Sequence, residues 1–324
     1  MGKRIYFTGF SHPALDYLPL TWGLLRAHAE QHEVVRASYV FERPMFRREA
    51  PDVLLSRIRE PFMLAVSCYV WNFQHTIALC RAVKEAHPEC IIVAGGPDVP
   101  ERPQGYFERH PYFDVLVHGE GEIPFTQLLL QYLEETPDLR KVPGITFNEG
   151  GREVTNEPSP KLPKEIDVPS PFLQGYFDDC LDEARMKSGE LNVLWETNRG
   201  CPYGCTFCDW GSATMNKLRQ FPIERLRGEI EWFSKHRVDL LNLADANFGL
   251  IERDLELTRT LVAAKAATGY PAQFRTNFAK NSNERVFEIS RLLHDAQMFT
   301  GTTLSMQSTS APVLAAIKRQ SIGI

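Results

Sequence analysis

Three cysteines packed into eight residues are the part of this sequence best suited to chemistry. Cys201, Cys205 and Cys208 have the spacing C-x3-C-x2-C, with Pro-Tyr-Gly and Thr-Phe between them. Thiolates are soft ligands that select zinc or iron–sulfur clusters, and three of them this close in sequence can face one metal centre. An iron–sulfur cluster held by only three cysteines would leave one iron open to a small molecule.

Two other interpretations of the three cysteines remain open. A structural zinc site normally has a fourth protein ligand, and no second C-x2-C or H-x3-H pair lies nearby. The cysteines could also be incidental, although this spacing favours a metal site. Seven cysteines in total is an odd number in a long chain, which argues against a disulfide framework.

The segment that follows the cysteines alternates predicted strands and helices. A strand at 192–197 leads into the cysteines, and further strands are predicted at 239–244, 272–276 and 302–306, with a helix after each strand. Four consecutive strand–helix units indicate part of a (β/α) barrel, in which functional residues lie at the carboxyl ends of the strands.

The first part of the chain predicts an α/β domain with a doubly wound parallel sheet. Strand-like runs occur at 5–7, 34–41, 62–67, 90–94 and 114–117, and helical patterns lie between them. Loops after parallel strands form a crevice at the carboxyl edge of the sheet, where glycines let the backbone approach a large planar ligand.

The expected domain boundaries follow from these patterns. Residues 1–135 form the first domain, residues 136–190 form a proline-rich connector, and residues 191–324 form the barrel segment. A complete barrel of this kind normally runs past about 200 residues, so the barrel is expected to be partial and truncated at its C-terminus.

Composition excludes several classes of protein. Hydrophobic residues make up 43% and charged residues 24%, as in ordinary globular proteins. A net charge of -5 argues against generic nucleic-acid binding. No apolar run is long enough to cross a membrane, and the polar start of the chain does not resemble a signal peptide, so a cytoplasmic location is expected.

The cysteine loop resembles the signature of the radical S-adenosylmethionine (SAM) enzymes, in which an aromatic residue, here Phe207, precedes the third cysteine. Its flanks resemble the subgroup with an N-terminal cobalamin (B12)-binding domain. The first domain shares features with that subgroup at Leu18-Pro19-Leu20, Ser67, Gly95-Gly96-Pro97 and Gly119-Glu120-Gly121-Glu122.

This resemblance implies a set of cofactors and contacts. The three cysteines would hold a [4Fe-4S] cluster that binds SAM at its open iron. SAM contacts would come from Phe207, Asp245, Asn247, Ser305 and Gln307, although the usual Gly-Gly-Glu sequence is missing before Asn247. Cobalamin contacts would come from Ser67, Gly95, Gly96, Gly119 and Glu120.

The motif D-x-H-x-x-G, which supplies a histidine ligand to cobalt in other cobalamin proteins, is absent. His12 lies in the corresponding loop, but its flanking residues do not match. Cobalamin is therefore expected to bind without a histidine lower ligand.

The implied activity is methylation of an unactivated carbon. One SAM would methylate cobalamin, and a second would generate the 5'-deoxyadenosyl radical that abstracts hydrogen from a small-molecule or peptide substrate. An electron donor would reduce the cluster. Two alternatives stay open: a rearrangement or cyclisation in which cobalamin carries no methyl group, and a truncated cobalamin-binding module without turnover.

Overall fold

The computed structural model describes residues 2–11, 16–208, 217–280, 284–299 and 305–319, and the chain divides into two compact units. Unit 1 contains Met1–Lys161 and Val168–Asp182, and unit 2 contains Leu162–Asp167 and Glu183–Ile324. The proline-rich segment at 136–190 therefore contributes chain to both units and forms no separate body. Among the described residues, no helix is long and apolar enough to cross a membrane.

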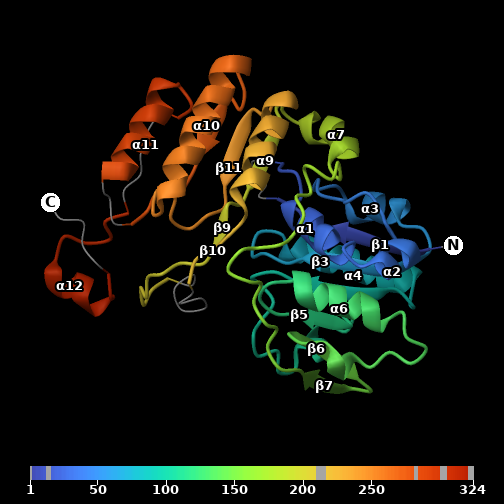
Figure 1. Ribbon diagram of the computed structural model, residues 1–324. Helices are drawn as coiled ribbons and strands as arrows, with labels where there is room; N and C mark the ends of the chain where they lie inside the picture. The colour runs from blue at the N-terminus through green and yellow to red at the C-terminus, as the bar shows by residue number, and fades with distance from the viewer. Residues whose placement is uncertain (1, 12–15, 209–216, 281–283, 300–304, 320–324) are drawn as a thin grey trace. The chain divides into compact units, whose positions relative to one another are not determined.

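Unit 1 is built on a seven-stranded sheet with the order β2-β1-β3-β4-β5-β6-β7 (Figure 1). Its strands are β1 (Lys3–Thr8), β2 (Tyr39–Phe41), β3 (Pro61–Ser67), β4 (Ile91–Gly95), β5 (Val115–Val117), β6 (Ile145–Glu149) and β7 (Arg152–Thr155). The first five strands pair in parallel, as predicted. The chain order reverses at β1, which lies between β2 and β3, and sheets of this kind bind ligands at that switch point.

Helices cover both faces of the sheet in unit 1. They are α1 (Leu20–Ala29), α2 (Glu33–Ser38), α3 (Pro51–Arg57), α4 (Phe73–Ala86), α5 (Tyr106–Arg109) and α6 (Glu122–Gln131), with short 3-10 turns at Leu139–Lys141 and Asp178–Cys180. Leu64 and Ile92 share a core with α3 and α4. Met63 and Val93 are also buried and point to the other side, because side chains alternate along a strand. On that side α1 packs against α6 (Figure 1).

Two features of unit 1 differ from the sequence-based expectation. Residues 34–41 do not form one strand, because residues up to Ser38 form α2 and only β2 pairs with the start of β1. The sheet is also mixed rather than purely parallel. The hairpin β6–β7 turns at Gly150 and Gly151, which both have positive φ, and β6 pairs antiparallel with β5, so the sheet gains two strands beyond β5.

Unit 2 contains a three-stranded parallel sheet with the order β12-β11-β8 (Figure 1). Its elements are β8 (Asn192–Trp195), α9 (Ile223–Lys235), β11 (Leu240–Leu243), α10 (Glu252–Thr268), β12 (Gln273–Arg275), α11 (Glu284–Asp295) and α12 (Ala311–Ala316), and α7 (Leu181–Arg185) precedes them. A separate two-stranded ribbon pairs β9 (Asn198–Arg199) with β10 (Arg219–Gln220).

The strand–helix alternation of unit 2 is the arrangement expected for the front portion of a (β/α) barrel. Three of the four predicted units are present, with α10 packed between α9 and α11. Of the fourth predicted strand, residues 302–304 lie outside the described residues, and residues 305–306 are not in a strand.

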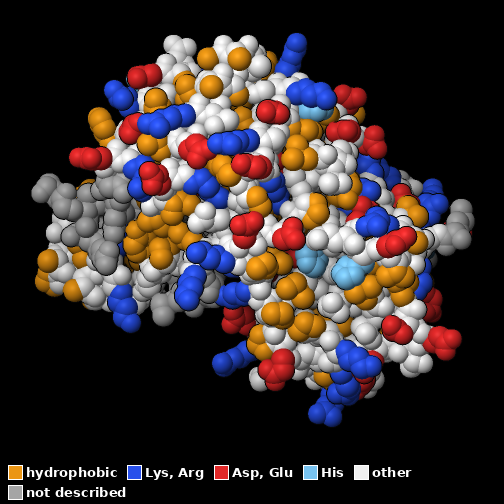
Figure 2. All heavy atoms as spheres, viewed as in Figure 1, with side chains coloured by type: hydrophobic (Ala, Val, Ile, Leu, Met, Phe, Trp, Pro, Cys, Tyr) orange, Lys and Arg blue, Asp and Glu red, His pale blue; other side chains and the backbone are white. Residues whose placement is uncertain are grey.

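The surface carries both signs of charge. Figure 2 shows lysine and arginine side chains interspersed with aspartate and glutamate side chains on the face in view.

Candidate functional site

The cysteine loop begins directly after β8 and β9, at the carboxyl end of the sheet in unit 2. Cys201 and Cys205 are buried, Cys208 is half-buried, and Phe207 is 51% exposed. The Cys208 N–H donates to the Cys205 carbonyl at 3.2 Å, and the Thr206 N–H donates to the Ile317 carbonyl at 3.1 Å. In the described ranges, no three His, Cys, Asp or Glu side chains are grouped closely enough to hold a metal ion.

The surroundings of two of the thiols nevertheless suit metal-bound sulfur. The amide Nδ2 of Asn247 lies 3.2 Å from the Cys201 Sγ, and the Lys280 Nζ lies 4.0 Å from the same sulfur. The Arg319 Nη1 lies 3.9 Å from the Cys205 Sγ. Each of these groups can only donate, so each favours a sulfur atom that carries negative charge, as a metal-bound thiolate does.

Three cysteines of unit 1 lie in a different environment. Burial raises the pKa of the Cys68 and Cys90 thiols to about 12, and it also raises the pKa of the Cys80 thiol well above its usual range. All three belong to the apolar core formed with α3 and α4. Inert thiols in an apolar core are typical of cysteines that serve packing alone.

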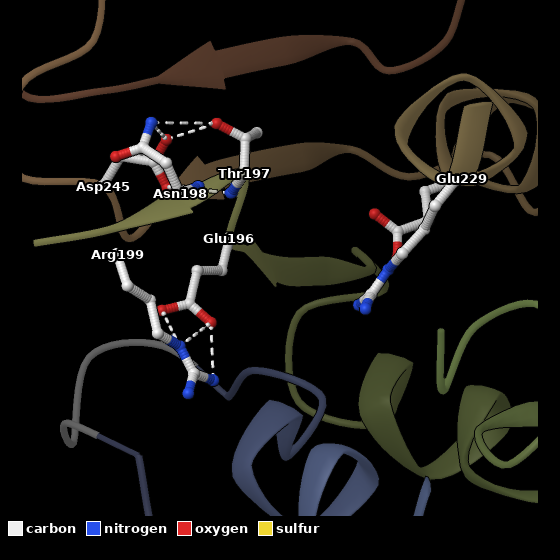
Figure 3. Close-up of polar contacts among 7 residues, drawn as sticks. Glu196, Thr197, Asn198, Arg199, Glu229 and Asp245 are labelled. Atoms are coloured by element: carbon white, nitrogen blue, oxygen red, sulfur yellow. Dashed lines mark hydrogen bonds and ion pairs between the residues drawn. The ribbon is translucent and has the colours of Figure 1, made fainter. Parts of the chain in front are cut away.

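Asp245, just after β11, forms hydrogen bonds with the residues that lead into the cysteine loop (Figure 3). Its Oδ1 accepts hydrogen bonds from the backbone N–H groups of Thr197 at 2.9 Å and Asn198 at 3.3 Å. Its Oδ2 accepts from the Thr197 hydroxyl and from the Asn198 Nδ2 at 2.7 Å. Burial raises the pKa of this carboxyl group to about 7. Asp245 therefore joins two strand ends three residues before Cys201.

Arg253 also fixes the position of the segment around Thr197. Arg253, near the start of α10, donates from Nη2 to the Thr197 carbonyl at 2.9 Å and from Nη1 to the Phe221 carbonyl at 2.6 Å. The Phe221 N–H also donates to the Thr197 carbonyl at 3.1 Å. Both the side chain and the backbone of Thr197 are thus fixed by distant parts of unit 2.

Two ion pairs lie close to the end of β8 (Figure 3). The Arg199 Nη2 forms an ion pair with the Glu196 Oε2 at 3.0 Å. Glu229 is fully buried, accepts from the Trp195 Nε1 at 2.7 Å and pairs with the Arg225 Nε at 2.8 Å. A buried carboxylate with both oxygens paired fixes the end of β8 against α9.

The side-chain oxygen of Asn247 lacks a hydrogen-bond partner among the described residues. Asn247 is 3% exposed, and while its Nδ2 contacts Cys201, its Oδ1 is buried. A buried unpartnered oxygen beside the first cysteine can accept a hydrogen bond from an ammonium group. The predicted polar contact of Asn247 with SAM stays a prediction.

The other predicted SAM contacts have less support from the packing. Ser305 and Gln307 are exposed, and Gln307 has a φ of 68°. Arg319 donates from Nη2 to the Ser305 carbonyl, which links this segment to the cysteine loop. The contacts of Phe207, Asp245, Ser305 and Gln307 with SAM stay predictions, and Asp245 has the structural role described above in addition.

The residues predicted to contact cobalamin gather at one edge of the sheet in unit 1. Ser67 ends β3 and pairs in register with Gly95 at the end of β4, while Gly119 and Glu120 follow β5. The structure therefore brings these positions together at the carboxyl edge, as the parallel order requires. His12 lies outside the described residues.

The glycines at this edge have different physical roles. A Cβ at Gly96 would lie 2.6 Å from the Cys68 carbonyl oxygen, and Gly96 has a φ of 105°, so the packing of two adjacent loops itself requires glycine. A Cβ at Gly119 would meet nothing within 4 Å, although its φ is 69°. The space beside Gly119 leaves its backbone accessible to a ligand.

Asn72 organises the switch point and was missed by the sequence reasoning. It is 1% exposed, and its Nδ2 donates to the Ser67 carbonyl at 2.9 Å and to the Phe10 carbonyl at 3.1 Å. Its Oδ1 accepts from the Tyr69 N–H at 2.8 Å. An asparagine directly before a helix at residue 73 suggests only a helix cap, so nothing local indicated that it joins the loops after β1 and β3.

Comparison with known proteins agrees with this arrangement. The family described as B12 binding domain matches residues 19–129. The chain is 52% identical over 323 residues to the 2-(S-pantetheinyl)-carbapenam-3-carboxylate methyltransferase of Streptantibioticus cattleyicolor. It is 50% identical over 323 residues to the cobalamin-dependent radical SAM methyltransferase TokK of Streptomyces tokunonensis. Over its whole length the chain is thus similar to proteins of the cobalamin-binding radical SAM family.

Both matches cover 100% of this chain but 47% of each relative, so the chain spans about half the length of the curated relatives it matches. Solved structures of this family have the same fold. The cobalamin-dependent radical SAM enzyme OxsB, with aqua-cobalamin and SAM bound, aligns over 99% of this chain and 46% of its own, with a TM-score of 0.68 and 16% identity. The methyltransferase TsrM of Kitasatospora setae aligns over 98% of this chain and 62% of its own, with a TM-score of 0.71 and 16% identity.

Proposed function

We propose that this chain carries the cofactor-binding part of a cobalamin-dependent radical SAM methyltransferase that methylates an unactivated carbon. The observation that carries this proposal is the cysteine loop, in which groups that can only donate face the sulfurs of Cys201 and Cys205 directly after a strand of a parallel sheet. The match of the B12 binding domain family to residues 19–129 supports the cobalamin half of the proposal.

In this proposal each cofactor has its own set of residues. Cys201, Cys205 and Cys208 hold the [4Fe-4S] cluster, and the buried Oδ1 of Asn247 accepts a hydrogen bond from the SAM ammonium group. Cobalamin lies along the sheet edge formed by the ends of β3, β4 and β5. When bound, the cluster and SAM supply a 5'-deoxyadenosyl radical, and cobalamin supplies a transferable methyl group.

The protein residues position these groups. Asp245 and Arg253 hold the segment before Cys201, so that the first cysteine has one position relative to the end of β11. Asn72 holds the loops after β1 and β3 at the switch point of the sheet. Fixed positions matter because small displacements of reacting groups slow a reaction strongly, and a primary carbon radical reacts with whatever it meets.

The substrate we propose is a pantetheinylated carbapenam, the compound named for the Streptantibioticus cattleyicolor relative at 52% identity. A one-electron donor must reduce the cluster before each turnover. The runner-up function is a cyclisation or rearrangement. It draws support from 30% identity, over 52% of this chain, to an anaerobic magnesium-protoporphyrin IX monomethyl ester cyclase of Synechocystis. A binding module without turnover is the third candidate.

Anaerobic reconstitution tests the proposal. The chain is loaded with iron, sulfide and hydroxocobalamin, and bound iron, sulfide and cobalt are measured, followed by 5'-deoxyadenosine after addition of SAM and dithionite. We expect Cys201→Ala, Cys205→Ala and Cys208→Ala to lose most of the iron, while the matched control Cys180→Ala in unit 1 keeps it.

The outcomes separate the three candidates. With the pantetheinylated carbapenam added as substrate, a product heavier by one methylene group supports methylation, whereas an isomerised or cyclised product without added methyl overturns it in favour of the runner-up. Cobalt binding without iron or 5'-deoxyadenosine supports the binding module. Full iron content in all three cysteine variants would show that the cluster assignment is wrong.

A further inference from the structure

Two cations and one amide point at the sulfurs of the cysteine loop from three separate segments. Asn247 follows β11, Lys280 follows β12, and Arg319 follows α12. The Asn247 Nδ2 lies 3.2 Å and the Lys280 Nζ lies 4.0 Å from the Cys201 sulfur. The Arg319 Nη1 lies 3.9 Å from the Cys205 sulfur. Segments far apart in sequence thus meet at the same two sulfur atoms.

The position of Arg319 is fixed by its surroundings. It is 6% exposed, and its Nη2 donates to the Ser305 carbonyl while its Nη1 lies against Cys205. The hydrogen bond from the Thr206 N–H to the Ile317 carbonyl joins its segment to the cysteine loop. A buried guanidinium held by a backbone carbonyl keeps its charge in one place.

Lys280 is half-buried, and its Nζ also lies 5.9 Å from the centre of the Tyr203 ring in the same loop. Within the part of the chain that the structure describes, neither Lys280 nor Arg319 forms an ion pair with a carboxylate. Their positive charge is therefore directed at the cysteine sulfurs rather than neutralised by a nearby acid.

We propose that Asn247, Lys280 and Arg319 raise the reduction potential of the cluster held by these cysteines. The inference rests on the proposed cluster. Reduction adds one electron from an external one-electron donor and makes the cluster and its thiolates more negative. Hydrogen bonds to sulfur and nearby positive charge stabilise the reduced form more than the oxidised form, and both are known to set cluster potentials.

The expected effect is a change in the ratio of reduced to oxidised cluster at a fixed potential. Lys280→Met and Arg319→Gln each remove one positive charge with little change of shape, and we expect each to lower this ratio about tenfold, which is about 59 mV for a one-electron couple. Asn247→Leu removes an uncharged donor, and we expect a decrease of roughly threefold. Lys280→Arg and Arg319→Lys keep the charge and should restore most of the ratio.

The experiment is an anaerobic redox titration of the reconstituted chain, with the reduced cluster measured by electron paramagnetic resonance. Iron and sulfide content is measured first for every variant. The matched control is Arg259→Gln, which removes a positive charge from the same unit at an exposed ion pair with Glu288. The control should leave the midpoint potential unchanged.

The outcomes distinguish this inference from the proposed function. If the wild-type chain takes up no iron and sulfide, the proposed cluster is wrong and the inference fails with it. If the chain loads a cluster and Lys280→Met, Arg319→Gln and Asn247→Leu load it equally at unchanged potential, the inference is overturned while the proposed function stands. Lys280 is half-buried, so Lys280→Met tests the charge effect even if Arg319→Gln does not fold.

Discussion

Replacing Asp245 with asparagine tests how the cysteine loop is held. The amide oxygen of Asp245→Asn can still accept from the backbone N–H groups of Thr197 and Asn198, as Oδ1 does now. The amide nitrogen would take the place of Oδ2 and face the Asn198 Nδ2, now 2.7 Å away, so two donors would oppose each other. One buried donor left without an acceptor costs about 1–3 kcal/mol.

The effect of Asp245→Asn should depend on pH, because burial raises the pKa of the Asp245 carboxyl group from 3.8 to about 7. A carboxyl group with a raised folded-state pKa contributes stability that is complete below its unfolded pKa and is lost as the pH rises through the folded value. Between pH 5 and 7 the wild type should lose about 1.4 kcal/mol per pH unit, or about 2–3 kcal/mol in total, from this group. Asp245→Asn has no carboxyl group at this position, so its stability should not show this loss.

The wild type should therefore be more stable than Asp245→Asn at pH 5 by about 1–3 kcal/mol, and the difference should vanish or reverse by pH 8. Urea unfolding of the apo chain at several pH values, followed by tryptophan fluorescence, measures this with the two units fitted separately. The control Asp295→Asn changes an aspartate whose side chain is 68% exposed and should run parallel to the wild type. Parallel curves for the wild type and Asp245→Asn would refute the reasoning.

Three further substitutions test the support of the two sites. Gly96→Ala should lower the unfolding free energy of unit 1 by about 2 kcal/mol or more, because its Cβ would lie 2.6 Å from the Cys68 carbonyl oxygen and Gly96 has a positive φ. The control is Gly95→Ala, where the nearest atom would lie 3.7 Å from the new Cβ. Equal effects of the two substitutions in urea unfolding would contradict the argument. Asn72→Ala removes three hydrogen bonds of a buried side chain. About 2–4 kcal/mol of unfolding free energy should be lost, and the affinity for aqua-cobalamin, measured by absorbance titration, should fall as well. Trp195→Phe leaves the buried Glu229 Oε2 without its indole donor and should lower the unfolding free energy of unit 2 by about 1–3 kcal/mol. An unchanged midpoint of thermal unfolding would contradict this expectation.

Local patterns in the sequence were sufficient for the parts of the fold that depend on them. The apolar run at 62–67 predicts β3 because a strand buried on both faces has few polar residues, and the structure places β3 at Pro61–Ser67. The parallel order then puts Ser67, Gly95 and Gly119 at one edge without further information. The cysteine spacing likewise predicts a loop after a strand, which is where Cys201 lies.

Features that depend on distant contacts were not predictable from the same patterns. Asp245 finds its partners 47 and 48 residues earlier in the chain, so the sequence suggested a SAM contact and indicated neither Thr197 nor Asn198. Lys280 and Arg319 have no local pattern that relates them to Cys201 or Cys205. The helix α2 appeared in place of the first part of a predicted strand because short apolar runs such as Val34-Val35 fit both structures.

Asp245 and Asn247 follow the same strand, two residues apart, yet they act on the cysteine loop in different ways. Asp245 contacts the backbone before the loop and sets where Cys201 lies, whereas Asn247 contacts the Cys201 sulfur itself. A change at Asp245 should therefore reduce how much iron the chain retains but leave the potential of the loaded cluster near that of the wild type. A change at Asn247 should have the opposite pattern, with iron retained and the potential lowered. Measuring iron content and midpoint potential on both variants separates position from electrostatics at one cysteine, a distinction that activity alone cannot make.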